Sequence, residues 1–234
     1  MTEYYCIAQL VVAMDTFGRT HRQAEPYRCE EGQANITIDS HWQELQALQP
    51  HLSDEDCEYL ASGADFYRQL LRYDGMMLHA SAVAVNGKAY LFFGPSGVGK
   101  STHTQLWRYC IPGSFILNDD KPALRQHDGA WYAYGTPWSG KQDMSVNVGM
   151  PVAGICLLQQ AENNWIAPLD GKEAIFAILE QTLRPGQPAL GEKLLELTDQ
   201  LIRSVPLWKM GCTPSGEAVL LAYEAMRQGD NCEN

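Results

Sequence analysis

The sequence predicts an α/β fold in which a mixed β-sheet is flanked by helices. Short runs rich in β-branched and aromatic residues alternate with stretches in which apolar residues recur at helical spacing. The dipeptide Asn86-Gly87 separates two strand-like runs, as expected for a tight hairpin, because both residues tolerate positive φ. The glycine-rich segment 94–101 (GPSGVGKS) stands between an apolar run and a helical pattern. Together these features indicate a strand-loop-helix unit within a larger sheet.

The length of 234 residues suits one α/β domain or a core with a small appended lobe. We expect residues 1–75 to form an N-terminal α+β lobe of strands and a helix, and residues 76–234 to form the main domain. In the N-terminal part, residues 4–13 and 34–38 are predicted strands. A helix is predicted from Ser53, a plausible N-cap followed by three acidic residues, to residue 73, with Asp74-Gly75 ending it. This part is interpreted either as a substrate-docking lobe or as extra strands on the main sheet.

After residue 76 the pattern predicts strands and helices in alternation. Predicted strands are 78–85, 88–93, 115–117, 123–126, 131–134 and 152–158. Predicted helices are 100–109, 172–181, 190–203 and 214–227. The last helix is expected to begin with Thr213 as N-cap and Pro214 at its first position.

The net charge limits the possible binding partners, and the cysteine pattern indicates the cellular compartment. A net charge of -11 argues against nucleic acid and anionic membranes as partners, since both require a positive face. The opening residues carry no basic leader, and no apolar stretch approaches the roughly 20 residues that a membrane helix needs. The seven cysteines are scattered, without a C-x-x-C pair. We expect a cytoplasmic protein with reduced thiols.

Residues 94–101 fit the Walker A pattern G-x-x-x-x-G-K-[ST] at each fixed position. Glycines in such a loop let successive backbone N–H groups surround an anion, and the following helix adds the positive end of its dipole. We therefore predict a site for ATP with Mg²⁺, in which Lys100 contacts the β- and γ-phosphates and Ser101 is a metal ligand. The predicted nucleotide-binding residues are Gly94, Pro95, Ser96, Gly97, Val98, Gly99, Lys100, Ser101 and Thr102.

Two aspartates follow the apolar run 115–117 and suggest a division of labour. Asp119 would hold the metal ion, and Asp120 would act as the general base that takes the proton of an acceptor hydroxyl. The competing interpretation is a turn or a helix cap before Pro122. Fifteen positions before the loop, His79 is a candidate to stabilise transferring charge or to tune Asp120, although an isolated histidine is more often a core residue.

The segment 135–141 (GTPWSGK) is dense in glycine and hydroxyl groups and ends in a cation. It is interpreted either as a cover over the phosphates or the acceptor, or as a plain hairpin loop. For Trp138 we expect packing rather than stacking on a base.

With these residues in view, the stretch from 76 to about 160 resembles the catalytic domain of HPr kinase/phosphorylase, which shares a core with the ATP-dependent phosphoenolpyruvate carboxykinases. The order His79, hairpin, phosphate loop, Asp119-Asp120 is similar to the family pattern. The resemblance implies a phosphate-loop kinase core of mixed sheet and helices, with Asp120 as the base and His79 at the active site. It also leaves open a homo-oligomer.

The chain departs from that family in three places. Residues 135–141 stand where the family has a glutamate-bearing segment, the C-terminal part offers no basic element to grip HPr, and residues 1–75 do not resemble the family's N-terminal domain. The chain is more similar to short HPr-kinase-related proteins of peptide-modification pathways. On that resemblance we expect a peptide or protein bearing serine as the phosphoacceptor.

The leading prediction is therefore a Mg²⁺- and ATP-dependent serine kinase. The alternatives are a kinase for a small metabolite and a non-catalytic ATP-binding regulatory module. A carboxykinase is the least favoured, because the short chain offers no obvious second site for a dicarboxylic acid.

Overall fold

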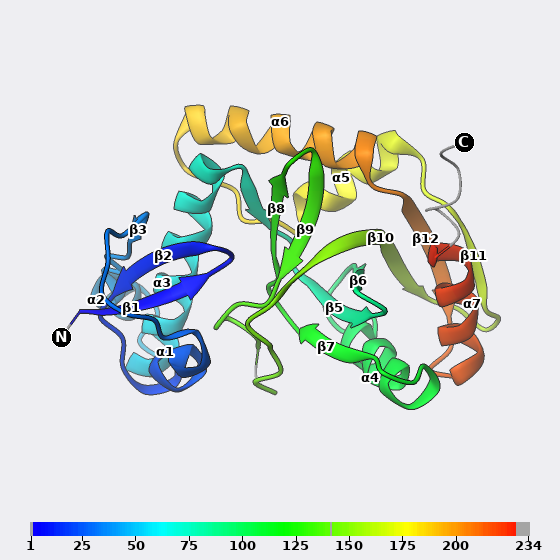
Figure 1. Cartoon of the computed structure of the whole chain (residues 1–234), viewed down its shortest axis with the longest axis horizontal. Helices are drawn as coiled ribbons and strands as arrows, with labels where there is room; N and C mark the ends of the chain where they lie inside the picture. Colours follow the sequence, from blue (N-terminus) through cyan, green and yellow to red (C-terminus); the bar gives the residue numbers. More distant parts are fainter. Residues whose placement is uncertain (1, 141, 228–234) are drawn as a thin grey trace.

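The computed structural model of the chain describes residues 2–140 and 142–227, and it shows a curled mixed β-sheet flanked by helices (Figure 1). The predicted α/β architecture is confirmed at this level. In the described residues, no helix has both the length and the apolarity to cross a membrane. The strands are β1 (Glu3–Ile7), β2 (Leu10–Met14), β3 (Ile36–Thr37), β4 (Gly75–Met77), β5 (Ala80–Val85), β6 (Lys88–Phe93), β7 (Phe115–Asn118), β8 (Ala123–His127), β9 (Ala130–Tyr134), β10 (Gly149–Gln160), β11 (Trp165–Pro168) and β12 (Leu207–Cys212). The α-helices are α1 (Gly18–Ala24), α2 (Trp42–Leu48), α3 (Asp54–Leu70), α4 (Lys100–Cys110), α5 (Gly171–Glu180), α6 (Pro188–Ser204) and α7 (Gly216–Arg227). Short 3₁₀ turns are η1 (Glu25–Tyr27) and η2 (Leu71–Tyr73).

The long strand β10 connects the two parts of the main sheet. Its first residues pair antiparallel with β9, which continues through β8 to β4. Its later residues pair in parallel with β6 on one side and with β12 on the other. Beyond β6, the sheet continues through antiparallel β5 to β7, and β11 adds to β12. The mixed pairing and the bend of β10 produce the curl that is visible in Figure 1.

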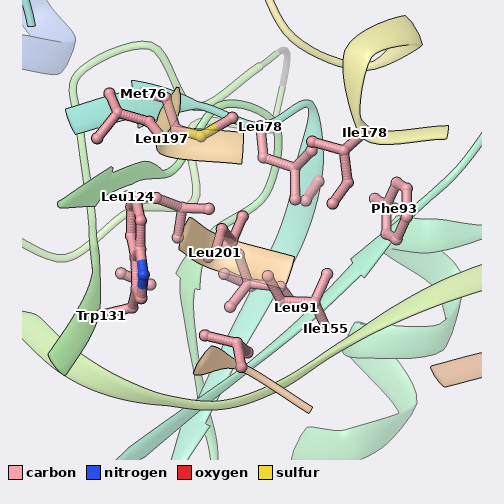
Figure 2. Close-up of a cluster of buried hydrophobic side chains, with 14 of the residues drawn as sticks. Met76, Leu78, Leu91, Phe93, Leu124, Trp131, Ile155, Ile178, Leu197 and Leu201 are labelled. Carbon is pink, nitrogen blue, oxygen red and sulfur yellow. The ribbon is translucent and has the colours of Figure 1, made fainter. Parts of the chain in front are cut away.

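Strands β5 and β6 are buried on both faces, and their side chains alternate between two hydrophobic cores. Ala80, Ala82 and Ala84 of β5 belong to the core under α5 and α6, whereas Val83 and Val85 belong to the core under α4 and α7. Figure 2 shows the first core, where Leu91 and Phe93 lie among side chains from the surrounding strands and helices. This period of two is the pattern of a strand, and burial on both faces explains why these runs are continuously apolar. The two helical layers thereby fix β6 and the loop that follows it.

The N-terminal residues contain a strand hairpin that the sequence pattern did not reveal. Residues 4–13 were expected as one strand, but Ala8 and Gln9 have positive φ values of 50° and 62° and separate β1 from β2. Neither residue favours the left-handed region, so the turn had no glycine or asparagine signal. The strand expected at 34–38 is confirmed as β3, which pairs in parallel with β2.

A third hydrophobic core joins these strands to α3 and to residues of the main sheet. It contains Tyr5 and Tyr27 as well as Phe66 of α3, and also Tyr134 and Trp138 from beyond the proposed boundary at residue 75. Trp138 is fully buried and stacks on Phe66 at a ring-centroid distance of 4.9 Å. Packing is thus confirmed for Trp138, whereas the division into two domains stays a prediction.

The start of α3 is confirmed, and the start of α7 is corrected. The Ser53 side chain accepts a hydrogen bond from the Asp56 amide at 3.1 Å, as an N-cap does. The helix α7 begins at Gly216 rather than near Pro214, and Ser215 accepts from the Ala218 amide at 3.3 Å. The sequence also gave no sign of β11, β12, α1 or α2. The elements β11, α1 and α2 have only four to seven residues, so their periodic pattern is weak, and Lys209 and Gly211 interrupt the apolar pattern of β12.

One acid is buried within α3, close to Thr20 of α1 and to Ser62 of α3 itself. Glu58 is 1% exposed, and among the described residues no hydrogen bond of normal geometry reaches either of its carboxyl oxygens. Burial raises the pKa of Glu58 to about 7, and the nearby hydroxyls of Thr20 and Ser62 lower it only in part. The neutral form of Glu58 is therefore the one that the fold favours.

The variant Glu58→Gln is expected to make the protein more stable above pH 7. The folded state binds this proton more tightly than the unfolded state, in which the pKa is near 4.5. The free energy of unfolding should therefore fall as the pH rises from about 4.5 to about 7 and then level off, by about 3 kcal/mol at most. Urea unfolding at pH 5 and pH 8 measures the difference, with Glu55→Gln, at a half-exposed position of the same helix, as the matched control. A pH dependence that is the same in Glu58→Gln and in the unmutated protein would contradict the assignment.

Candidate functional site

The glycine-rich loop connects β6 to α4. It leaves β6 after Phe93, and α4 begins at Lys100. Gly97 and Gly99 have φ values of 79° and 108°, and apart from their neighbours in the chain no residue comes within 4 Å of the position where a Cβ would stand. A Cβ at Gly94, whose φ is 144°, would instead lie 2.9 Å from the carbonyl oxygen of Leu158 in β10. The loop thus rests on β10 at its start and has free space beside its middle, as a loop that surrounds an anion requires.

Lys100 folds back over this loop. Its Nζ donates to the carbonyl oxygens of Gly94 at 2.9 Å and Pro95 at 3.3 Å, and the residue is 8% exposed. Burial lowers the pKa of Lys100, and the carboxylates of Asp120 and Asp119 partly offset this effect. A largely dehydrated ammonium held by neutral carbonyls is well prepared to exchange one of them for an anion.

Asp119 lies at the end of β7 beside the first turns of α4. Ser81 of β5 donates to its Oδ1 at 2.6 Å, and the Ser81 hydroxyl also contacts Thr104 Oγ1 at 2.6 Å. Burial raises the pKa of Asp119, whereas hydrogen bonds from Ser81 and Ser101 lower it. The two predicted metal ligands, Ser101 and Asp119, are therefore neighbours. Within the described residues, no three His, Cys, Asp or Glu side chains cluster as a metal site made by protein alone.

Asp120 is the next residue, and its carboxylate faces two basic side chains. His79 Nε2 lies 3.2 Å from Oδ1, and Lys121 Nζ contacts Oδ2. Burial alone would raise the pKa of Asp120, but the hydrogen bond from His79 and the charge of Lys121 outweigh it, and the pKa lies below its ordinary value. Asp120 is therefore ionised at neutral pH, in the state that can accept a proton.

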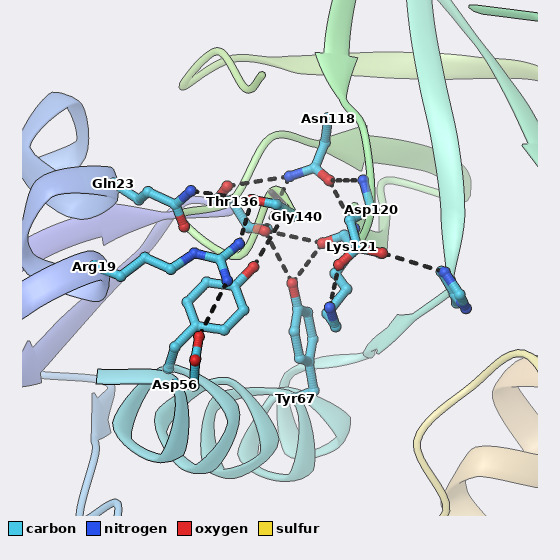
Figure 3. Close-up of polar contacts among 11 residues, drawn as sticks. Arg19, Gln23, Asp56, Tyr67, Asn118, Asp120, Lys121, Thr136 and Gly140 are labelled. Carbon is cyan, nitrogen blue, oxygen red and sulfur yellow. Dashed lines mark hydrogen bonds and ion pairs between the residues drawn. The ribbon is translucent and has the colours of Figure 1, made fainter. Parts of the chain in front are cut away.

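Asn118 holds the turn that contains Asp119 and Asp120. Its Oδ1 accepts from the backbone amides of Asp120 at 3.0 Å and Lys121 at 2.7 Å, an Asx-type turn that closes the end of β7. Its Nδ2 donates to the carbonyl oxygen and to the hydroxyl of Thr136, each at 3.1 Å. Tyr67 of α3 completes this network through bonds to the Lys121 carbonyl at 2.5 Å and the Thr136 hydroxyl at 2.9 Å (Figure 3). The turn is thus tied both to the segment after β9 and to α3.

The predicted catalytic and metal residues other than Lys100 line a common cavity of about 530 Å³, here called the Asp120 cavity. Ser96 and Ser101 contribute from the loop side, and His79, Asp119 and Asp120 from the sheet side. A second cavity of about 470 Å³ lies on the other side of the loop, and it is lined by Gly97, Val98, Gly99 and Thr102 together with residues that follow β12. The predicted site residues therefore lie around one loop, with Gly94 and Pro95 holding the Lys100 side chain.

The Asp120 cavity also contains residues from the N-terminal part that were not predicted. Arg19 of α1 donates to the carbonyl oxygen of Gly140, and Gln23 donates to the same oxygen at 3.2 Å. The Gly140 amide donates to the Tyr59 hydroxyl at 3.0 Å. Gly140 itself lies against Asp120, because a Cβ there would come within 2.9 Å of the Asp120 Cβ. We call Arg19, Gln23 and Tyr59 the Gly140 clamp, of which Figure 3 labels Arg19 and Gln23 beside Gly140.

These contacts bear on the two interpretations of residues 135–141, which are a cover over the phosphates or the acceptor and a plain hairpin loop. The segment is not a tight hairpin turn, since the chain runs on to residue 148 before β10 begins. Ser139 is buried, whereas Gly140 is partly exposed and borders the Asp120 cavity. Lys141, the cation of the predicted segment, lies outside the described residues. Gly140 of this segment therefore borders the Asp120 cavity, and a cover over the phosphates or the acceptor stays a prediction.

The variant Arg19→Ala is expected to lower the free energy of unfolding by about 1–3 kcal/mol. It removes a charge-assisted hydrogen bond to Gly140 and the stacking of the guanidinium over the Tyr59 ring, whose centroid lies 3.8 Å from Cζ. Urea unfolding measures the effect.

The matched control for this prediction is Arg22→Ala on the same helix. Arg22 is mostly exposed and pairs with Glu55 at 3.1 Å, a surface ion pair that contributes about 0–1 kcal/mol. Equal losses of stability in Arg19→Ala and Arg22→Ala would contradict a special role for the Gly140 clamp.

Sequence reasoning missed several polar residues of the site. Ser81 and Asn118 were visible next to His79 and Asp119, and a polar residue inside an otherwise apolar strand was their only signal. Arg19 lies 75 positions and Tyr59 lies 35 positions before Gly94, the first residue of the loop, so no local pattern could connect them with it.

Comparison with known proteins places the chain in a family. The profile of the SynChlorMet cassette protein ScmC matches residues 53–217. The chain belongs to the ScmC family. The ScmC match includes α3, the glycine-rich loop and both aspartates, and it begins after α1 and α2. No curated protein sequence matches the chain.

Among solved structures, the chain is similar to the HPr(Ser) kinase/phosphatase from Coxiella burnetii. The identity is 16%, the TM-score is 0.37, and the match covers 68% of this chain and 99% of that one. A likeness this weak does not extend to function.

Proposed function

We propose that this protein is a Mg²⁺- and ATP-dependent kinase that phosphorylates a serine-type hydroxyl of a peptide or protein. The observation that carries the proposal is the Asp120 cavity, in which an ionised Asp120 paired with His79 lies opposite Ser96 and Ser101 of the glycine-rich loop. Phosphoryl transfer depends on positioning and on neutralising charge, and a cavity with a base on one wall and a phosphate loop on the other provides both.

The loop residues fit the phosphates of a nucleotide. The first amides of α4 have no partner within the helix, and Gly97 and Gly99 leave room beside them. Lys100 supplies a positive charge at the same place. We assign the phosphates to this loop and the rest of the nucleotide to the 470 Å³ cavity beside Gly97 and Thr102, whose size is in the range of ligand sites.

The donor set also fits Mg²⁺. This ion usually keeps several waters and takes one or two carboxylates together with substrate phosphates. Asp119 and the Ser101 hydroxyl, which donates a hydrogen bond to it, provide such a partial set. When bound, Mg²⁺ would offset the charge of the phosphate oxygens.

Asp120 would act on the acceptor. The acceptor oxygen forms a bond to the γ-phosphorus while the bond from that phosphorus to the bridging oxygen breaks, and its electron pair leaves with ADP. The hydroxyl proton passes to the Asp120 carboxylate and then to solvent. His79 and Lys121 hold this carboxylate in its ionised form before the step, and Gly140 fixes its position.

The test is transfer of labelled γ-phosphate from ATP to serine-bearing peptides encoded near the gene, with and without Mg²⁺. Phosphoserine that forms only with Mg²⁺ supports the proposal. Calorimetry of ATP binding is run alongside. Binding without transfer to any acceptor would favour the regulatory module, and absence of binding would contradict the phosphate-loop assignment.

A further inference from the structure

A small apolar pocket adjoins the Asp120 cavity. Its volume is about 240 Å³, and it lies between α3, β4 and the segment that follows β9. Tyr59, Leu60 and Lys121 line both hollows, so the pocket and the cavity share one wall. We call it the apolar side pocket, and it is defined further by Gly63, Ala64, Tyr67, Met77 and Trp138.

Two small residues of α3 create this hollow. Gly63 and Ala64 face it, and a Cβ at Gly63 would lie 2.8 Å from the Cδ1 atom of Trp138. The floor is rigid, because Trp138 is fully buried and stacked on Phe66. Leu60 at the rim is 43% exposed, so the pocket opens to solvent. The pocket is thus preformed and accessible.

The polar groups around the pocket are already engaged. The Trp138 Nε1 donates to Ser62 at 3.2 Å, and the Tyr67 hydroxyl bonds to the Lys121 carbonyl and to Thr136. The Lys121 ammonium is directed to Asp120, which leaves its methylene chain for the pocket wall. An occupant of this pocket would therefore be apolar, since a polar occupant would lose its hydration without gaining a partner.

Size and position restrict the occupant further. A volume of about 240 Å³ lies below the roughly 300–1,000 Å³ of sites for whole small molecules, and it suits one large side chain. Consecutive Cα atoms of a peptide are about 3.8 Å apart. A residue whose hydroxyl reaches Asp120 therefore places its neighbour's side chain within reach of the shared wall.

We propose that the apolar side pocket binds a bulky apolar side chain next to the phosphorylated serine of a peptide acceptor. This inference rests on the proposed kinase function, and it names the class of acceptor: a serine flanked by a residue such as leucine. Burying such a side chain contributes about 1.5–3 kcal/mol, which corresponds to a preference of about 10- to 100-fold.

The test compares two peptides, acetyl-Gly-Gly-Leu-Ser-Leu-Gly-Gly-amide and the same peptide with alanine in place of both leucines. Binding is measured by fluorescence anisotropy of labelled peptide, and transfer by labelled γ-phosphate. The protein is expected to favour the leucine peptide at least about tenfold in both assays.

The variant Ala64→Leu fills the pocket. It should weaken the binding of the leucine peptide alone, so that the ratio between the two peptides falls close to one. Ala47→Leu, at an exposed position of α2, is the matched control and should keep the preference. Folding of each variant is checked by urea unfolding. If Ala64→Leu does not fold, Leu60→Ala, which removes part of the rim, should lower the preference instead.

The outcomes separate this inference from the proposed function. Transfer to both peptides at equal kcat/KM would overturn the pocket assignment and leave the kinase intact. Tighter binding of the leucine peptide that is lost in Ala64→Leu, without transfer, would support the pocket and contradict the kinase. If both peptides bind equally or not detectably, and neither is phosphorylated, the pocket assignment is overturned. It is also overturned if Ala64→Leu weakens the binding and transfer of both peptides equally.

Discussion

Replacing Asp120 with asparagine should slow phosphoryl transfer about a thousandfold and leave the affinity for ATP with Mg²⁺ within a few fold. The amide has nearly the shape of the carboxylate, but it cannot accept the acceptor's proton, and a general base contributes about 10²–10⁴ to the rate. Binding should survive because the loop and Asp119 are unchanged. The loss of the Asp120 charge also removes one of the causes that raise the pKa of Asp119. Single-turnover transfer and calorimetry measure the two quantities.

The matched control for this prediction is Asp128→Asn in the turn between β8 and β9. Asp128 is exposed and has a positive φ of 48°, which asparagine accepts readily. Its rate of transfer should be unchanged. A residual rate in Asp120→Asn above about a tenth of the unmutated rate would assign the base to another residue. Loss of binding in the same variant would show that Asp120 holds the metal ion.

Replacing Lys100 with methionine should weaken ATP binding about a hundredfold, which is about 2.7 kcal/mol. Hydrogen bonds between a charged donor and a phosphate contribute about 1.5–3 kcal/mol each, and they count most where water is excluded. Lys100 is 8% exposed, so its charge is screened little. Methionine keeps the length of the side chain and removes only the ammonium. Calorimetry with ATP and Mg²⁺ measures the change.

Lys172→Met, at an exposed position at the start of α5, is the control for the loss of one positive charge. It should bind ATP as the unmutated protein does. If Lys100→Met binds ATP normally, the glycine-rich loop does not hold the phosphates, and the assignment of the site fails. A fall in affinity that is equal in both variants would indicate a nonspecific effect of net charge.

The arrangement around the glycine-rich loop was predictable because its signals are local. A hairpin marked by Asn86-Gly87, a loop with fixed glycines and a polar end of β7 each depend on residues adjacent in the sequence. Their positive-φ residues have few alternatives, so the pattern determines the backbone. The roles of Lys100 and Asp120 remain predictions, although both now lie at the same loop.

The contribution of the N-terminal part could not be predicted, because it depends on contacts between distant segments. Gly140 is bound by residues more than 80 positions earlier in the chain, and nothing near Arg19 in the sequence indicates a site. The turn at Ala8 and Gln9 escaped for another reason, since its residues do not favour the conformation that tertiary packing imposes. In both cases tertiary packing determines a structure that the local sequence does not specify.

The position of strand β10 in the sheet affects which parts of the protein unfold locally. It exchanges backbone hydrogen bonds with β9, β6 and β12, so separating any of these neighbours disturbs the others. Segments tied in this way unfold as one cooperative unit, and their amides exchange with solvent last. Because β6 leads directly into the glycine-rich loop, that loop is anchored in the part of the sheet that is slowest to open. Local unfolding at the edges of the fold should therefore disturb the glycine-rich loop little.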